Sequence, residues 1–154
     1  MVSIARIDQG ELTGAALDKV LNARVSATLA FLDRDGCPRQ FPCWYVWHDD
    51  SFCTTSDPDK YHVRCLRRDP RASMCVEYTE GELPPRAGDS RVNWQVKGHG
   101  AVTIEPDTDS RIWRLIRERY LGAVPSETET SDRLVLRLRP TKLAAHGGTM
   151  HFSP

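Results

Sequence analysis

An Asp-Gly pair between two apolar segments constrains the fold of this chain more than any other feature of its sequence. Residues 25–33 read Val-Ser-Ala-Thr-Leu-Ala-Phe-Leu-Asp, and a second apolar segment spans about 39–48, after Asp35-Gly36. An Asp-Gly pair between such segments is a strong signal for a tight hairpin. The sequence therefore predicts two neighbouring antiparallel strands over 25–33 and 39–48. Pro42 has no backbone N–H, so the second strand is expected to lie at an edge or to face a ligand there.

Further strands and helices follow in an order that favours a barrel. Strands are expected over 52–55, 71–79, 91–104 and 133–139, and helices after Thr13, after Ser56-Asp57-Pro58 and over 107–120. The segment 80–90 holds two prolines and two glycines and is expected to be a loop. Gly98-His99-Gly100 inside the long strand predicts a bulge or a close backbone approach. About six antiparallel strands with inserted helices indicate a closed or nearly closed barrel with peripheral helices.

Length and charge limit the class of protein. The 154 residues fit one domain, 1–154, with 1–11 and 146–154 expected to be loose termini. The 21 basic residues balance 21 acidic ones, which argues against a non-specific nucleic-acid binder. No apolar segment is long enough for a membrane helix, and residues 1–8 do not resemble a signal peptide. The five cysteines form no CxxC pair, so a reducing, cytoplasmic location is expected, with Cys43, Cys53 and Cys75 as small buried side chains.

The segment from Thr54 to Arg71 is the best candidate for binding chemistry. Thr54, Thr55 and Ser56 end a predicted strand, and a helix N-terminus follows, where free N–H groups and the helix dipole favour anions. Lys60, Arg64 and Arg68 are spaced to share one helix face. The segment alone still favours a solvated basic face over a phosphate site. His62 is equally compatible with a phosphate contact and with a surface position.

Other constellations are weaker. Trp44, Tyr45 and Trp47 offer flat surface for a ring, although core packing is the more frequent role of such aromatic residues. His146 and His151 lie in a glycine-rich tail without an acidic or cysteine partner, so no metal site is predicted. No nucleophile and base stand together in a recognisable motif. If the protein is an enzyme, a cofactor is expected to carry its chemistry.

Several segments in order along residues 12–145 resemble one known superfamily. They are Ala27-Thr28-Leu29-Ala30, Asp33-Arg34-Asp35-Gly36-Cys37-Pro38, Pro42-Cys43-Trp44-Tyr45-Val46-Trp47, Thr54-Thr55-Ser56, Val63-Arg64-Cys65-Leu66-Arg67-Arg68-Asp69-Pro70-Arg71, Val96-Lys97-Gly98-His99-Gly100-Ala101, Arg119-Tyr120-Leu121-Gly122 and Leu136-Arg137-Leu138-Arg139-Pro140-Thr141. These segments are similar to the pyridoxamine 5′-phosphate oxidase-like, FMN-binding split β-barrel proteins. Within that superfamily the chain resembles the actinobacterial deazaflavin- or flavin-dependent oxidoreductases.

The resemblance implies a mainly β fold: a six- or seven-stranded antiparallel split β-barrel of the FMN-binding type. It implies a homodimer that binds coenzyme F-420, a deazaflavin, or FMN in two sites at the subunit interface. The residues implied to contact the cofactor are Phe41, Pro42, Cys43 and Trp44 at the ring, Thr54, Thr55 and Ser56 at ring or phosphate, Lys60, His62 and Arg64 at the phosphate, and Asn93 near the partner subunit's cofactor. His62 stands where the family commonly has lysine.

The expected function is hydride transfer between the bound deazaflavin or FMN and a small conjugated organic substrate. Tyr45, His48 and His62 remain alternatives for protonating the product. True pyridoxamine-phosphate oxidase activity is less expected, because the basic C-terminal substrate motif of that subgroup is missing. Two other functions stay open: a non-catalytic flavin- or haem-binding or sensing protein, and a structural dimer whose site has decayed.

Overall fold

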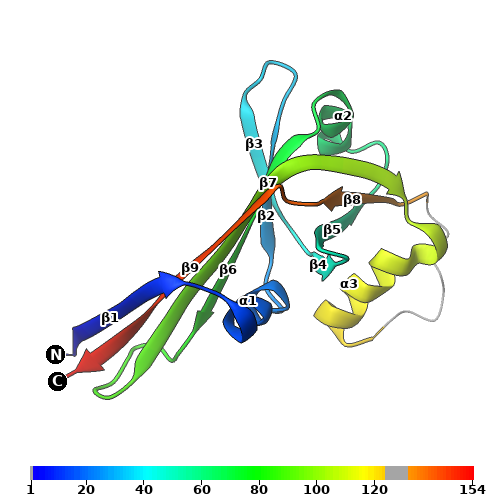
Figure 1. The fold of residues 1–154 in the computed structure, drawn as a ribbon. Coiled ribbons are helices and arrows are strands. Elements are labelled where there is room, and N and C mark those ends of the chain that lie inside the picture. Colours follow the sequence, from blue (N-terminus) through cyan, green and yellow to red (C-terminus); the bar gives the residue numbers. More distant parts are fainter. Residues whose placement is uncertain (1, 124–131) are drawn as a thin grey trace.

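Antiparallel strands make up most of residues 2–123 and 132–154, the parts of the chain that the computed structural model describes (Figure 1). Their bounds are β1 (Ser3–Glu11), β2 (Ala27–Leu32), β3 (Pro38–Cys43), β4 (Val46–His48), β5 (Ser51–Ser56), β6 (Arg71–Glu80), β7 (Ser90–Pro106), β8 (Leu134–Leu138) and β9 (Lys142–Ser153). The helices are α1 (Gly14–Leu21), α2 (Tyr61–Arg68) and α3 (Arg111–Leu121), with a 3₁₀ turn, η1 (Thr108–Ser110), before α3. In these described parts, no helix is long and apolar enough to cross a membrane.

The sheet is an open barrel. Its order is β3-β2-β6-β7-β8-β5-β4, and β9 pairs with both β7 and β1. The two edge strands, β3 and β4, are consecutive in the chain but do not pair with each other. The split β-barrel is therefore confirmed. The nine described strands exceed the six or seven expected, because the terminal segments pair and the predicted strand over 39–48 divides into two.

Trp44-Tyr45 divides that predicted strand. The Tyr45 side chain is fully buried, and its hydroxyl donates a hydrogen bond at 2.9 Å to the carbonyl of Leu21, the last residue of α1. This inward anchor redirects the chain, so that β3 pairs with β2 while β4 pairs with β5. The apolar segment 39–48 predicts a single strand, because the local sequence carries no signal of this contact with a distant helix.

The terminal segments correct a second expectation. Residues 1–11 and 146–154 were expected to be loose, but β1 pairs with β9 from Ser3↔Ser153 to Glu11↔His146, and β9 also pairs with β7. β1 and β9 find each other across more than a hundred residues of the chain. Local sequence, particularly the glycines of 146–148, carries little signal for such long-range pairing.

The long strand β7 passes from one half of the barrel to the other at Gly98-His99-Gly100. A Cβ at Gly98 would lie 2.8 Å from the Phe52 ring, and one at Gly100 would lie 2.8 Å from the Arg139 carbonyl oxygen. The register with β6 runs without a shift through both glycines. The close backbone approach is confirmed, and there is no bulge at this point of the described pairing.

The helices cover the inner face of the sheet and one of its outer sides. Val20 and Leu21 of α1 and Val63 and Leu66 of α2 join the main core with Leu29 and Met74. α3 packs on β4, β5 and β8, where Ile112, Ile116 and Val135 form a second cluster. Val135 of β8 is therefore buried under α3.

The opposite face of β3, β2, β6 and β7 is exposed or half-buried. We call it the open face. Because paired residues of antiparallel strands share a face, the pairings Thr28↔Pro42, Thr28↔Cys75, Ala30↔Ser73 and Ser73↔His99 place small or polar side chains next to one another there. The open face is thus broad and carries mainly small or polar side chains, with the half-buried Leu32 at its end beside Pro38.

Candidate functional site

A cavity of about 400 Å³ lies between β3 and α2, at the open edge of the barrel. We call it the α2 cavity. Its lining is Phe31, Arg39, Gln40, Phe41, Tyr61 and His62. The rings of Phe41 and His62 are stacked, with their centres 4.3 Å apart, and Phe31 meets Phe41 edge-on at 6.1 Å. The cavity therefore offers flat aromatic walls with a cation beside them.

Arg39 is held in position by a buried carboxylate. Asp33, whose side chain is 3% exposed, accepts hydrogen bonds from Arg39 Nε at 2.9 Å and from the backbone N–H groups of Asp35 and Cys37. The bond from Arg39 is the main cause that lowers the pKa of Asp33, so this carboxylate stays ionised. Within the described residues, the terminal guanidinium nitrogens of Arg39 make no hydrogen bond. They remain free to bind an anion.

No motif in the sequence points to Arg39 as a site residue. The sequence signal for Arg39 is the Asp33 carboxylate six residues earlier, which the hairpin turn brings within 2.9 Å of Arg39 Nε. Phe31, Gln40 and Tyr61 were missed as cavity residues for a related reason: the sequence assigns them to a strand or a helix without showing that the edge of β3 and the start of α2 face each other.

His62 lines the α2 cavity and carries a titratable imidazole. Its Nε2 lies 2.7 Å from Ser56 Oγ, and the Ser56 hydroxyl also lies 3.2 Å from the Asp57 carbonyl. Partial burial, and secondly the nearby charge of Lys60, lower the pKa of His62 below its ordinary value. The imidazole is therefore neutral near pH 7. Ser56 is itself buried, so its role is to hold His62 in place.

The helix after Ser56 begins later than predicted. Asp57 to Lys60 form a turn, closed by a hydrogen bond from the Lys60 N–H to the Asp57 carbonyl, and α2 starts at Tyr61. Lys60 thus stands immediately before the helix, with its Nζ 3.7 Å from the Asp57 carboxylate. Arg64 donates to the Asp59 carbonyl. Lys60, His62 and Arg64 therefore gather at the N-terminal end of α2.

The remaining predicted site residues lie outside the lining of the α2 cavity. Thr54 is buried, and its hydroxyl donates to the Trp44 carbonyl at 2.7 Å. Trp44 is 40% exposed and stacks on Tyr120, with the ring centres 4.8 Å apart. Pro42 is exposed on the edge strand, and Thr55 is half-buried in β5. Burial raises the pKa of Cys43 to about 11, so its thiol stays protonated.

Asn93 is remote from the α2 cavity within one chain. It pairs with Thr79 of β6 and Gly148 of β9. In Figure 1, α2 lies at the end of the molecule opposite the tips of β1 and β9.

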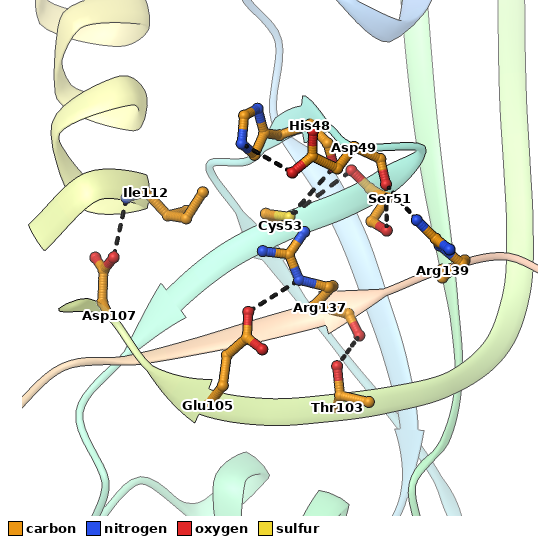
Figure 2. A network of polar contacts seen from close by, with 10 residues as sticks. All are labelled: His48, Asp49, Ser51, Cys53, Thr103, Glu105, Asp107, Ile112, Arg137 and Arg139. Atoms are coloured by element: carbon orange, nitrogen blue, oxygen red, sulfur yellow. Dashed lines mark hydrogen bonds and ion pairs between the residues drawn. The ribbon is translucent and has the colours of Figure 1, made fainter.

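The candidate proton donors are in different environments. Tyr45 is buried with its hydroxyl engaged by backbone carbonyls, and desolvation raises its pKa well above the ordinary value. His48 belongs to a polar network outside the α2 cavity (Figure 2). There it pairs with Asp49 at 3.3 Å, while Arg137 pairs with Glu105 at 2.9 Å. Of the three, only His62 lines the α2 cavity.

Comparison with known proteins gives one family and several similar folds. The sequence model of the family described as pyridoxamine 5′-phosphate oxidase matches residues 13–147. The chain has no significant match among the curated proteins.

Three solved structures illustrate the similarity in fold. A Bacteroides thetaiotaomicron protein named for resistance to 5-nitroimidazole antibiotics has a TM-score of 0.74 at 11% identity, covering 100% of this chain and 96% of its own. An FAD- and haem-binding protein from Mycobacterium smegmatis has a TM-score of 0.67 at 20% identity, covering 89% and 71%. An F420 reductase has a TM-score of 0.60 at 20% identity, covering 82% and 94%.

These structures share the split barrel at low identity, while the sequence match spans most of the chain. The chain belongs to the pyridoxamine 5′-phosphate oxidase family.

Proposed function

We propose that the protein is a cofactor-dependent oxidoreductase that uses coenzyme F-420 or FMN to exchange a hydride with a small conjugated organic substrate. The observation that carries the proposal is the α2 cavity, where aromatic walls adjoin the fixed Arg39 guanidinium and the basic start of α2. Family membership and the F420 reductase and FAD-binding neighbours support a cofactor of this type.

The residues present fit a ligand with a flat ring system and a phosphate. Arg39, Lys60 and Arg64 supply three cations within one region of the molecule, and the first N–H groups of α2 add donors without side chains. Phe41, Tyr61 and His62 provide ring faces beside them. His62 takes the place of a stronger cation, so the other three must bind most of the phosphate charge.

The cofactor, when bound, supplies or accepts the hydride. The chain binds and orients it: cations hold the phosphate, and the edge of β3 lies beside the ring. His62, held by Ser56, is the side chain of the α2 cavity suited to exchange a proton near neutral pH. We place this chemistry in the cytoplasm, in keeping with five cysteines that form no disulfide.

We further propose that the protein is a homodimer with the cofactor between its subunits. Asn93 is remote from α2 in its own chain, so it can approach the cofactor only from a second copy. The open face, with its small side chains, suits close approach of another subunit.

Titration of the purified protein with F-420 and with FMN, each followed by fluorescence, tests the cofactor assignment. We expect saturable binding of at least one cofactor. Lys60→Ala and Arg64→Ala should each weaken it about tenfold, as expected for the loss of one charge-assisted hydrogen bond.

Arg67→Ala is the matched control, because it removes the same charge from the exposed last turn of the same helix. Its affinity should equal that of the wild type. Failure of the folded wild-type protein to bind either cofactor would rule out the proposal. Equal effects of all three substitutions would show general electrostatic attraction rather than a built phosphate site.

A second candidate function is non-catalytic binding of flavin or haem. It is favoured by the FAD- and haem-binding neighbour from Mycobacterium smegmatis. The visible spectrum of the purified protein separates the two functions, because a Soret band would favour haem.

A further inference from the structure

A second cavity, of about 630 Å³, lies where β1, β9 and β7 run side by side. We call it the terminal-strand cavity. It shares no lining residue with the α2 cavity. In Figure 1 the tips of these strands extend away from the barrel, at the opposite end from α2.

Glycine makes the floor of this cavity. Gly148 pairs with Gln9 on one side and Asn93 on the other, so it occupies the middle of a row of three residues on the same face. Its missing side chain leaves bare backbone between two amides. A Cβ added at Gly148 would lie only 3.3 Å from Gln9 Cγ, so even an alanine here would crowd the Gln9 side chain at the floor of the cavity.

The rows on either side of Gly148 complete the cavity. Ile7 and Met150 pair with each other in one row and give an apolar wall. Gln95 and Glu11 flank His146 in the other row. Among the described residues, the side chains of Gln9, Asn93 and Gln95 have no hydrogen-bond partner. Three amides, each able to donate and to accept, are therefore available to one ligand.

The charge of this lining differs from that of the α2 cavity. No lysine or arginine lines it, and Glu11 is its one carboxylate. Arg91 pairs with Met150 at the edge of the cavity, outside this lining. A phosphate or carboxylate held by the lining residues themselves would lose its hydration without gaining a cation from them. An uncharged ring would stack on the flat peptide groups of Gly147 and Gly148, contact Ile7 and Met150, and exchange hydrogen bonds with the amides.

We propose that the terminal-strand cavity binds an uncharged planar heteroaromatic compound whose edge carries a carboxamide or a similar donor–acceptor pair. The binding site itself requires no cofactor. Its assignment as the pocket for the organic substrate rests on the proposed function and homodimer, because only the second copy can bring its cofactor near Asn93.

Nicotinamide and nicotinate form a matched pair of probes, since they share a ring and differ by an amide against a carboxylate. Saturation-transfer NMR on the full chain, without cofactor, should detect nicotinamide binding. Nicotinate should bind at least about fivefold more weakly, the effect of losing about one net hydrogen bond. Asn93→Leu and Gly148→Ala should each weaken nicotinamide binding to a similar degree.

Arg67→Ala is the control, because Arg67 is exposed and lines neither cavity, and its nicotinamide affinity should equal that of the wild type. Circular dichroism checks that each variant folds. If Gly148→Ala does not fold, the substitution of the exposed Asn93 still tests the site. If the folded wild type does not bind nicotinamide, the inference is overturned. A second copy of the chain that fills the cavity would give this result. Equal binding of nicotinate would overturn it too. Nicotinamide binding without any F-420 or FMN binding would instead uphold this site and reject the proposed function.

Discussion

His62 is the side chain of the α2 cavity whose charge changes near neutral pH. The groups around it are Lys60 and Arg64 on or beside α2, Arg39 on β3 and the Ser56 hydroxyl. The nearby Asp57 carboxylate lies 3.7 Å from Lys60 Nζ. Burial and the Lys60 charge lower its pKa, so the unfolded chain takes up a proton at this residue more readily than the folded protein does. Its contribution to stability is therefore present above its ordinary pKa of about 6.5 and is lost as the pH falls through the folded-state value.

A bound phosphate reverses this balance, because an anion beside the imidazole favours its protonated form. We expect the affinity for FMN to depend on pH through His62, with the wild type gaining affinity relative to His62→Asn as the pH falls from about 8 to about 6. Because the phosphate of FMN titrates over the same range, the comparison between the two proteins isolates the histidine. Fluorescence titration at each pH measures it, and parallel curves would show that His62 does not contact the phosphate.

At the scale of elements, caps and close contacts decide where helices begin and strands end. Asp107 lies before α3, and its carboxylate accepts hydrogen bonds from the backbone N–H groups of Ile112 and Trp113, both at 2.9 Å. These donors have no partner within the helix. α3 covers β4, β5 and β8, so its capping also supports one side of the barrel.

Replacing Asp107 with alanine should lower the free energy of unfolding by about 1–2 kcal/mol, the usual range for a lost cap. Urea denaturation followed by circular dichroism measures this loss. Asp109→Asn is the control, because Asp109 is exposed and asparagine tolerates its positive φ. Cofactor affinity should not change in either variant, since both residues lie outside the α2 cavity. If Asp107→Ala has the same free energy of unfolding as the wild type, water bonds the Ile112 and Trp113 N–H groups as well as the carboxylate does.

At the scale of the whole molecule, the chain has net charge zero but an uneven distribution of charge. Cations gather at α2 and the edge of β3, while the terminal-strand cavity has no lysine or arginine in its lining. The open face lies between these two regions, and a second copy placed on it would bring the two kinds of cavity together. The proposed dimer thus gives a role to β1, whose residues are all exposed in the isolated chain.

Ala30→Glu tests that arrangement. Ala30 lies on the open face beside Gln40 and Ser73, so a carboxylate there would be buried in the proposed interface without a partner. Size-exclusion chromatography with light scattering should give about twice 17.4 kDa for the wild type and 17.4 kDa for the variant. Arg114→Glu, on the exposed side of α3, should leave the mass unchanged. A monomeric wild type would reject the dimer.

The sequence by itself determined the hairpin at Asp35-Gly36, most strand positions, the core periodicity of the helices and the basic segment after β5, because these depend on neighbours within a few residues. The tertiary structure alone decided the break between β3 and β4 at Trp44-Tyr45, the β1–β9 pairing and the burial of the Thr54 hydroxyl against the Trp44 carbonyl. Each depends on a partner outside the local segment. The same holds for the candidate site. Lys60, His62 and Arg64 could be read from local spacing, whereas Arg39 joins them only because the fold brings the edge of β3 against α2.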